Sequence, residues 1–312
     1  MLERPLGSTP WTVPVICTGT SALGSFPAQY GYTIDDDTAV GAILESVSAG
    51  FTFIDTSNEY GGGESEKRIG AALARLGGVP EGVLIATKVD PLPGSVDFSG
   101  ERVRASVEES RERLGMDTLP LVYLHDPEKI GFAASMAPGG PVEALVELRE
   151  AGVIGALGVA GGPIDMELDF LRTGVFEVVL SHNRYTLIDS SAEPLIAECA
   201  ARGVGFVNAA PFGGGMLVKG PTEVPRYCYA PVADVVLERA HAIERACLAH
   251  GVPLAAAALQ FSVRDERVGS TVVGMSRPQR FAEMLALLDT PIPAQLWEEL
   301  APLIGAGREG VL

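Results

Sequence analysis

Positive charge is scarce in this chain. Lysine and arginine together number 23 against 40 aspartates and glutamates, which gives a formal net charge of −17. Nucleic acids and anionic membranes are bound through basic faces. We therefore expect neither as a partner, and we expect the acidic surface to keep the protein soluble.

Long hydrophobic runs and the features of a signal peptide are also missing. The most apolar stretch, residues 252–263, is too short to cross a bilayer. The opening MLERPLGSTPWTV has no basic start followed by an apolar core, so it does not resemble a signal peptide. These features predict a cytoplasmic protein.

The sequence has few cysteines and histidines, which are the usual ligands of structural zinc. Its four cysteines lie far apart, without the spacing of a metal site, at Cys17, Cys199, Cys228 and Cys247. Reduced thiols are typical of a cytoplasmic protein. His241 and His250 are nine residues apart, which does not match the H-x-x-x-H spacing of zinc enzymes. We expect no metal.

The glycine-rich motifs of common nucleotide-binding folds are absent as well. The first candidate strand runs into GTSALGSF (19–26), which does not match G-x-G-x-x-G. The segment GGGESEK (61–67) lacks the spacing of a P-loop. This disfavours a doubly wound open sheet.

What the sequence does contain is a repeated alternation of helix and strand. Amphipathic stretches end in glycine and lead into short apolar runs, as in ELREAGVIGALGV (147–159). The expected strands are 15–19, 53–55, 84–88, 121–125, 156–159, 178–181, 205–208 and 271–274. The expected helices are 38–48, 65–76, 99–114, 142–151, 166–173, 192–202, 232–250 and 278–288.

Eight such units predict a (β/α)8 TIM barrel that forms a single domain over residues 1–312. Residues 1–14, with the turn-like GSTP, are expected to form a hairpin that caps the amino-terminal end of the barrel. The connections 126–140 and 209–231 are longer than a barrel needs. Because they follow strands, we expect them on the catalytic face.

Four polar residues fall at or just beyond expected strand ends, which converge on one rim in a parallel barrel. They are Asp55, Tyr60, Lys88 and His125. Taken singly, each also has a structural explanation, such as a turn cap for the aspartate or packing for the tyrosine. Lys88 favours a catalytic interpretation of the group. Lysine is rare in this chain, which has 19 arginines and four lysines, so a lysine at the end of an apolar strand suggests a chemical requirement.

The four residues together predict a proton-transfer site. A tyrosine hydroxyl has a pKa of about 10, and a nearby ammonium should lower it. Asp55 would keep Lys88 charged, and His125 would donate a hydrogen bond to the reacting oxygen. Paired carboxylates for glycoside cleavage remain open in a barrel, but they would not explain Lys88 or Tyr60.

The segment FIDTSNEYGGGESEKRIGAAL (53–73) resembles the signature of the aldo-keto reductase superfamily. IATK (85–88) and YLHDP (123–127) are similar to its lysine and histidine segments. The resemblance covers nearly the whole chain. It implies that Tyr60 is the general acid/base, that Lys88 and Asp55 tune it, and that His125 orients the substrate carbonyl. It also implies NAD(P) bound across the rim.

The same resemblance suggests cofactor contacts. They are Gly19, Thr20, Asp55, Ser181, His182, Pro211, Phe212, Gly213, Gly215, Leu217, Gly274, Ser276, Arg277, Arg280 and Glu283. His182 replaces a glutamine that meets the nicotinamide amide, Ala209 replaces a stacking tyrosine, and Met284 replaces an asparagine that faces the adenine. Arg277 could grip a 2′-phosphate, so NADP and NAD both remain open.

Two further segments, RYTLIDSSAEPL (184–195) and GVIGALGVAGG (152–162), resemble the aldose dehydrogenase branch, which acts on L-fucose, D-threo-aldoses or L-galactose. The expected reaction is hydride transfer from an anomeric carbon to nicotinamide, which yields a lactone. The alternatives are a general aldehyde or ketone reductase, a pyridoxal-type dehydrogenase, and a cofactor-binding regulatory subunit without catalysis. We expect a monomer or a small homo-oligomer.

Overall fold

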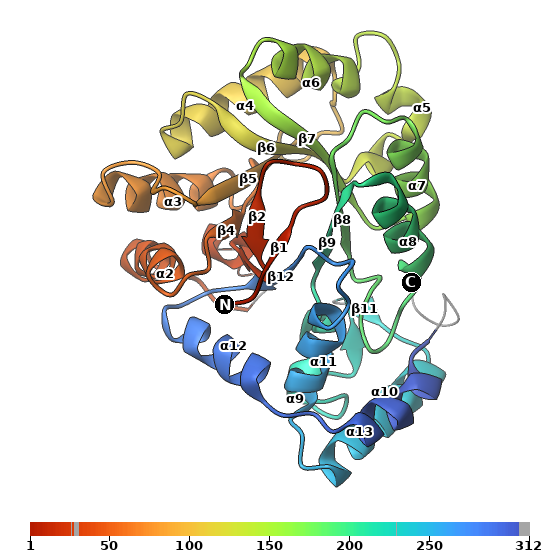
Figure 1. The fold of residues 1–312 in the computed structure, drawn as a ribbon. Helices are drawn as coiled ribbons and strands as arrows, with labels where there is room; N and C mark the ends of the chain where they lie inside the picture. The colour runs from red at the N-terminus through yellow and green to blue at the C-terminus, as the bar shows by residue number, and fades with distance from the viewer. Residues whose placement is uncertain (26, 28–30, 229, 306–312) are drawn as a thin grey trace.

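A computed structural model describes residues 1–25, 27, 31–228 and 230–305 (Figure 1). Its central strands are β3 (Ile16–Gly19), β4 (Phe53–Asp55), β5 (Leu84–Val89), β6 (Leu119–His125), β7 (Ile154–Gly161), β8 (Val178–His182), β9 (Gly205–Ala209) and β12 (Ser270–Gly274). They are parallel and form a closed barrel in the order β12-β3-β4-β5-β6-β7-β8-β9. The predicted (β/α)8 barrel is confirmed.

Helices surround this barrel. The longer ones are α2 (Asp36–Ser48), α3 (Glu64–Arg75), α4 (Gly100–Leu114), α6 (Pro141–Glu150), α7 (Ile164–Arg172), α8 (Glu193–Arg202), α10 (Asp234–Ala249), α11 (Leu254–Val263) and α12 (Gln279–Asp289). Shorter helical segments are η1 (Ser21–Gly24), η2 (Pro127–Lys129), α5 (Phe132–Ser135), η3 (Gly213–Gly215), α9 (Met216–Lys219), α13 (Ala294–Leu300) and η4 (Ala301–Leu303). Every predicted strand and helix begins and ends within two residues of the observed one.

One helix of the barrel is not predicted by the sequence pattern. The pattern predicts a single helix, over 232–250, before the last strand, whereas the structure has both α10 and α11 there. α11 packs against β12 and α12, and its residues 255–259 are all buried. A helix that is apolar on all sides has no polar stripe from which to recognise it. Among the described residues no single helix is long and apolar enough to span a membrane, although α10 and α11 pass that test together across a 101° bend.

The amino-terminal hairpin closes one end of the barrel. It pairs β1 (Glu3–Pro5) with β2 (Thr12–Pro14) and lies in front of the strands in Figure 1. Leu6 and Val13 belong to the apolar cluster inside the barrel. The Arg4 guanidinium donates hydrogen bonds of 2.7, 2.8 and 2.9 Å to three backbone carbonyls between residues 263 and 268. The opposite end, where the strands finish, is therefore the end left open to ligands.

A second small hairpin lies in the long connection after β9. It is made by β10 (Arg226–Tyr227) and β11 (Ala230–Pro231). The Tyr227 side chain is fully buried, and its hydroxyl group donates a 2.9 Å hydrogen bond to the carbonyl of Asn183. This connection is anchored beside the end of β8, on the face that the sequence analysis expects to be catalytic.

Candidate active site

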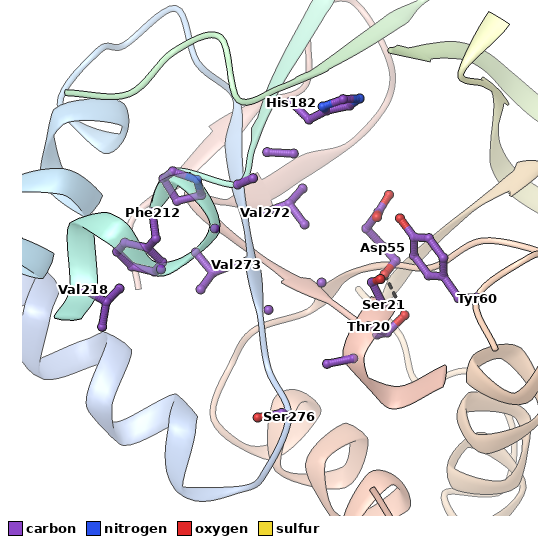
Figure 2. Close-up of a pocket in the computed structure, with 18 of the residues that line it drawn as sticks. Thr20, Ser21, Asp55, Tyr60, His182, Phe212, Val218, Val272, Val273 and Ser276 are labelled. Atoms are coloured by element: carbon purple, nitrogen blue, oxygen red, sulfur yellow. Dashed lines mark hydrogen bonds between the residues drawn. The ribbon is translucent and has the colours of Figure 1, made fainter. Parts of the chain in front are cut away.

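Three adjacent strands bring the predicted catalytic residues together. Asp55 ends β4, Lys88 is one residue from the end of β5, and His125 ends β6. Tyr60 lies in the loop after β4. All four line one cavity of about 680 Å³, and Figure 2 shows Asp55 and Tyr60 side by side on one wall.

Lys88 is the buried centre of this group. Its Nζ atom lies 2.6 Å from Asp55 Oδ1 and 3.2 Å from Tyr60 Oη, and it also donates a 2.6 Å hydrogen bond to the carbonyl of Thr56. The Lys88 side chain is 2% exposed. Burial, the largest single effect, lowers the pKa of Lys88, but the charge of Asp55 and the interactions with Tyr60 together raise it by more, so the net pKa lies above its ordinary value. Lys88 is therefore an ammonium at neutral pH.

Tyr60 differs from the sequence expectation in one respect. The ammonium of Lys88 does lower the pKa of the phenol, but burial raises it by more, and the charge of Asp55 adds to the increase. The net pKa of Tyr60 is thus raised, not lowered. The prediction was wrong because it counted the neighbouring charge and not the loss of water around the hydroxyl group. In the free protein Tyr60 is a neutral phenol.

The acidic residue that contacts His125 was not predicted from the sequence. Asp90, immediately after β5, places its Oδ1 2.6 Å from His125 Nδ1. It is 1% exposed, and its other oxygen accepts hydrogen bonds from the Ser57 hydroxyl group and from the Glu59 backbone N–H at 3.1 Å. The signal was available, because an acid directly after an apolar strand is also what singled out Asp55.

Most of the predicted cofactor contacts line the same cavity. They are Gly19, Thr20, Asp55, His182, Pro211, Phe212, Gly215, Gly274, Ser276 and Arg280. Figure 2 shows Phe212 on the wall opposite Tyr60, with Ser276 towards the far end. Ala209, where the resemblance leads one to expect a stacking ring, also lines the cavity. The cavity thus runs from the catalytic group to the start of α12.

Five predicted contacts do not line the cavity. Ser181 is fully buried and its hydroxyl group donates a 2.8 Å hydrogen bond to Glu167. Leu217 is part of the apolar core, and Gly213 packs under the ring of Tyr227. The side chains of Arg277 and Glu283 are exposed and pair with each other.

Several lining residues were not predicted individually. They include Tyr32, Val218, Lys219, Val224 and Arg226. All but Tyr32 belong to the long connection 209–231, which the sequence analysis placed on the catalytic face without naming these side chains. Loop side chains carry no periodic pattern from which their direction can be predicted.

A carboxylate holds two arginines at the far end of the cavity. Glu283 Oε1 lies 2.6 Å from Arg277 Nη2, and Glu283 Oε2 lies 3.0 Å from Arg280 Nη1. Arg280 is the member of this group that lines the cavity. Both guanidinium groups therefore already have an anionic partner.

A closed parallel barrel with an Asp–Tyr–Lys–His group at its open end defines a class of barrel oxidoreductase. The structure is similar to that of an aldo-keto reductase from Bacillus halodurans in its holo form, with a TM-score of 0.78 over 100% of this chain and 99% of that one at 22% identity. That likeness supports the fold. Residues 15–304 match the sequence model of the Aldo/keto reductase family.

Curated relatives agree over nearly the full length. The chain is 33% identical to D-threo-aldose 1-dehydrogenase from a Pseudomonas species, over 90% of this chain and 93% of that one. It is also 33% identical to L-galactose dehydrogenase from Arabidopsis thaliana, over 91% and 86% of the two chains. This chain belongs to the aldo/keto reductase family, and it is an NAD(P)-dependent oxidoreductase.

The cavity fits a nicotinamide cofactor. Gly19 and Thr20 lie beside the catalytic group, and Gly215 approaches from the connection after β9 with a φ of 107°, which favours glycine. A Cβ atom on Gly19 would lie 2.8 Å from the Val272 side chain, so this wall has no room for one. A wall formed by backbone, without side chains that project into the cavity, suits an extended ligand.

Proposed function

We propose that this protein oxidises an aldose at its anomeric carbon and yields the lactone. The arrangement that supports this is the buried Lys88–Asp55 pair beneath the Tyr60 hydroxyl group, with His125 on the same cavity wall. A protein that only binds a cofactor has no use for an ion pair buried under a phenol. A bound nicotinamide would supply the hydride acceptor, and Tyr60, Lys88 and His125 would hold the substrate oxygen.

Tyr60 and His125 are the groups that meet the substrate oxygen in this proposal. Their rings are 6.0 Å apart between centroids, in an edge-to-face arrangement, so one oxygen atom can accept or donate hydrogen bonds on both sides. In reduction the neutral phenol gives its proton to the carbonyl oxygen, and the Lys88 ammonium, 3.2 Å from Tyr60 Oη, stabilises the phenolate that results. In oxidation, the proposed direction, this phenolate takes the proton of the substrate hydroxyl group.

The choice of an aldose is supported by the relatives. The two at 33% identity are named for an aldose and for L-galactose. Polar side chains at the cavity mouth, among them His182 and Arg226, can bind the remaining hydroxyl groups of a sugar.

A substrate panel tests the proposal directly. Purified protein is incubated with L-fucose, L-galactose and D-arabinose together with NAD or NADP, and the absorbance of the reduced cofactor is followed. We expect turnover of at least one aldose, and loss of that turnover in Tyr60→Phe. Efficient reduction of aromatic aldehydes without oxidation of any aldose would instead identify a general carbonyl reductase.

Pyridoxal is the second candidate substrate. The chain is 28% identical to pyridoxal 4-dehydrogenase from Microbacterium luteolum over 96% of both chains. Including pyridoxal in the same panel separates the two functions. Oxidation of pyridoxal with a higher kcat/KM than any aldose would favour this candidate.

NAD is the proposed cofactor in preference to NADP. The 2′-phosphate of NADP needs a free guanidinium at the adenosine end of the cavity, whereas Glu283 already pairs with Arg277 and Arg280. NAD has a hydroxyl group at that position and does not compete with the carboxylate. Comparing the turnover with NAD and with NADP in the substrate panel measures this preference.

A further inference from the structure

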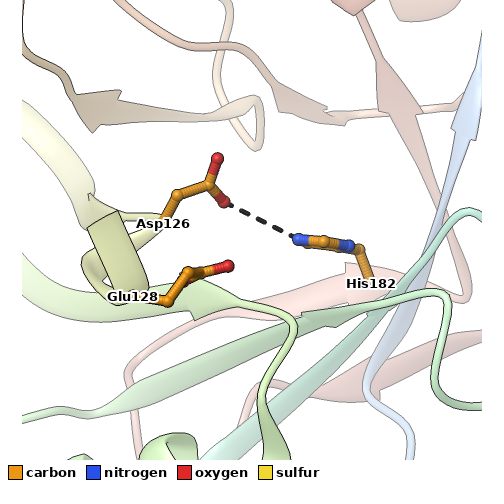
Figure 3. A group of neighbouring side chains, drawn as sticks. All are labelled: Asp126, Glu128 and His182. Atoms are coloured by element: carbon orange, nitrogen blue, oxygen red, sulfur yellow. Dashed lines mark ion pairs between the residues drawn. The ribbon is translucent and has the colours of Figure 1, made fainter. Parts of the chain in front are cut away.

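Three side chains that can ligate a cation meet near the open end of the barrel. Asp126 and Glu128 belong to the turn after β6, and His182 is the last residue of β8. Each offers one ligand atom within 4.8 Å of the other two, and Figure 3 shows these atoms pointing toward one another. Asp126 Oδ1 lies 3.6 Å from His182 Nε2. Zinc bonds to such atoms are about 2.0–2.2 Å long, so two atoms at this separation can share one ion.

The carboxylate oxygens of this group lack other partners. Asp126 Oδ1 and Glu128 Oε2 are buried and make no hydrogen bond with any described residue. A polar atom without a partner is costly away from water. The second oxygen of Asp126 lies 3.5 Å from the Lys129 ammonium, whereas Oδ1 faces the imidazoles of His182 and, at 3.7 Å, of His125. Both unpartnered oxygens are therefore suited to a positive ligand.

A fourth carboxylate, from a different element, is an independent sign of such a ligand. Glu167 on α7 is 1% exposed. Its Oε2 atom accepts a 2.8 Å hydrogen bond from the Ser181 hydroxyl group, whereas its Oε1 atom makes none with any described residue. A Cβ atom on Gly161 would lie 3.8 Å from Glu167 Oε1 and 3.2 Å from Glu128 Oε2. The two unpartnered oxygens thus face the same space, which the absence of a side chain on Gly161 leaves open.

The nearby cationic side chains are directed elsewhere. Lys129 lies between Asp126 Oδ2 and, at 3.7 Å, Glu59. Arg184 donates a 3.0 Å hydrogen bond to the carbonyl of Gly162 and lies 3.4 Å from Asp189. Neither makes a hydrogen bond to the unpartnered oxygens. The local charge therefore favours an added cation.

The imidazole of His182 has a neighbour that can set its tautomer. Asn183 Nδ2 lies 3.1 Å from His182 Nδ1, and Asn183 Oδ1 is buried without a hydrogen-bond partner among the described residues. Turning the amide over exchanges its donor for its acceptor, so that Oδ1 accepts from an Nδ1–H group and Nε2 keeps its lone pair for a metal. Histidines that ligate a metal almost always have such a partner on the other nitrogen.

The donor set indicates the kind of ion. One imidazole nitrogen and two carboxylate oxygens suit a first-row divalent cation such as Zn²⁺, whereas Mg²⁺ and Ca²⁺ prefer oxygen ligands throughout. Three protein ligands leave a fourth position for water. A sugar hydroxyl group cannot reach these buried oxygens unless the wall moves, so the group is not a subsite for the substrate.

We propose that Asp126, Glu128 and His182 bind one Zn²⁺ ion, or another divalent transition metal of similar size, and that Glu167 strengthens the site with a further negative charge. The proposal goes beyond the oxidation of an aldose, no step of which uses this ion. The expectation of no metal was drawn from the spacing of cysteines and histidines. Ligands that come from two strand ends, and are mainly carboxylates, have no such spacing.

Calorimetric titration of the full-length protein with ZnCl₂ tests the site, after treatment with a chelator that is then removed. We expect one ion bound per chain. Glu167→Gln should weaken binding about 10–100-fold, the usual effect of losing a group beyond the ligands, and His182→Gln and Glu128→Gln should each weaken it by more. The same titration with CoCl₂ should produce visible absorption bands that His182→Gln removes.

His241→Gln is the matched control. His241 Nδ1 also lies 3.6 Å from a carboxylate, that of Glu244, but among the described residues the two belong to no group of three ligands. This variant should bind Zn²⁺ as the wild type does. In NMR spectra of the four histidines, Zn²⁺ should shift the His182 signals and leave those of His241 and His250 in place.

The proposal is overturned if the wild type does not bind Zn²⁺, if His182→Gln binds it equally well, or if the signals of His241 or His250 shift instead. His182 is 37% exposed, so its replacement should leave the fold intact even where Glu128→Gln does not fold. None of these measurements requires turnover. A failure of the proposed oxidation is therefore distinguishable from a failure of the metal site.

Discussion

Lys88 Nζ lies 2.6 Å from Asp55 Oδ1, and the two side chains are only 2% and 5% exposed. Taking two charges out of water is costly, and each is tolerated only because the other is present. This pair therefore couples the catalytic group to the stability of the barrel.

Removing one member of the pair should destabilise the protein strongly. Lys88→Met leaves Asp55 buried and uncompensated, and we expect a loss of about 3–5 kcal/mol in the free energy of unfolding. The double variant Asp55→Asn/Lys88→Met should recover most of the stability and none of the activity. Urea unfolding measures the first effect and the aldose assay the second. A single variant as stable as the wild type would show that the ion pair is not buried in solution.

The Tyr60 hydroxyl group should matter for rate and not for folding. We expect Tyr60→Phe to lower kcat by about 10²–10³-fold, the usual effect of losing one donor to a developing negative oxygen, with the KM for the cofactor nearly unchanged. Tyr185→Phe is the matched control, because that hydroxyl group donates to Asp265 and does not line the cavity. Equal activity in wild type and Tyr60→Phe would favour a non-catalytic role for the protein.

Glu283 should control the choice between the two cofactors. Replacing it by glutamine frees Arg277 and Arg280 for a 2′-phosphate. Because exposed charge pairs contribute about 1 kcal/mol at most, we expect the kcat/KM for NADP relative to NAD to rise about fivefold. Glu298→Gln on α13 serves as the control. An unchanged ratio would mean that the arginines do not reach the cofactor.

Adding a single methyl group at Gly7 in the amino-terminal hairpin should destabilise the protein. Gly7 has a φ of 60°, and a Cβ atom there would lie 2.2 Å from the backbone nitrogen of Gly205. Gly50 has a φ of 81° with nothing within 4 Å of such an atom. Gly50→Ala should therefore cost about 1 kcal/mol, and Gly7→Ala at least about 2 kcal/mol more, because backbone has to move. Equal thermal midpoints for the two variants would contradict the close packing of this cap.

The sequence predicted the barrel because each strand is a short apolar run bounded by helix-ending glycines. It predicted that Asp55, Lys88 and His125 meet around one cavity because they stand at the ends of such runs, and their catalytic role stays a prediction. It missed α11, where burial on all sides removes the polar stripe, and it missed Asp90, whose contact with His125 depends on how two strands lie side by side. The predicted direction of the Tyr60 pKa shift was wrong for the same kind of reason, since the burial of a side chain is set by the tertiary structure. The cytoplasmic location and the oligomeric state stay predictions.

The pairing of β12 with β3 has a consequence for how the chain assembles. The last strand of the barrel lies beside the first, with Thr271 opposite Ile16, so the ring cannot close until the chain from β3 to β12 has been synthesised. Until then the two edge strands are open to other chains, and contacts between such distant segments form slowly. Synthesis of this protein should therefore depend on protection of its nascent edges, and truncation before β12 should yield aggregates.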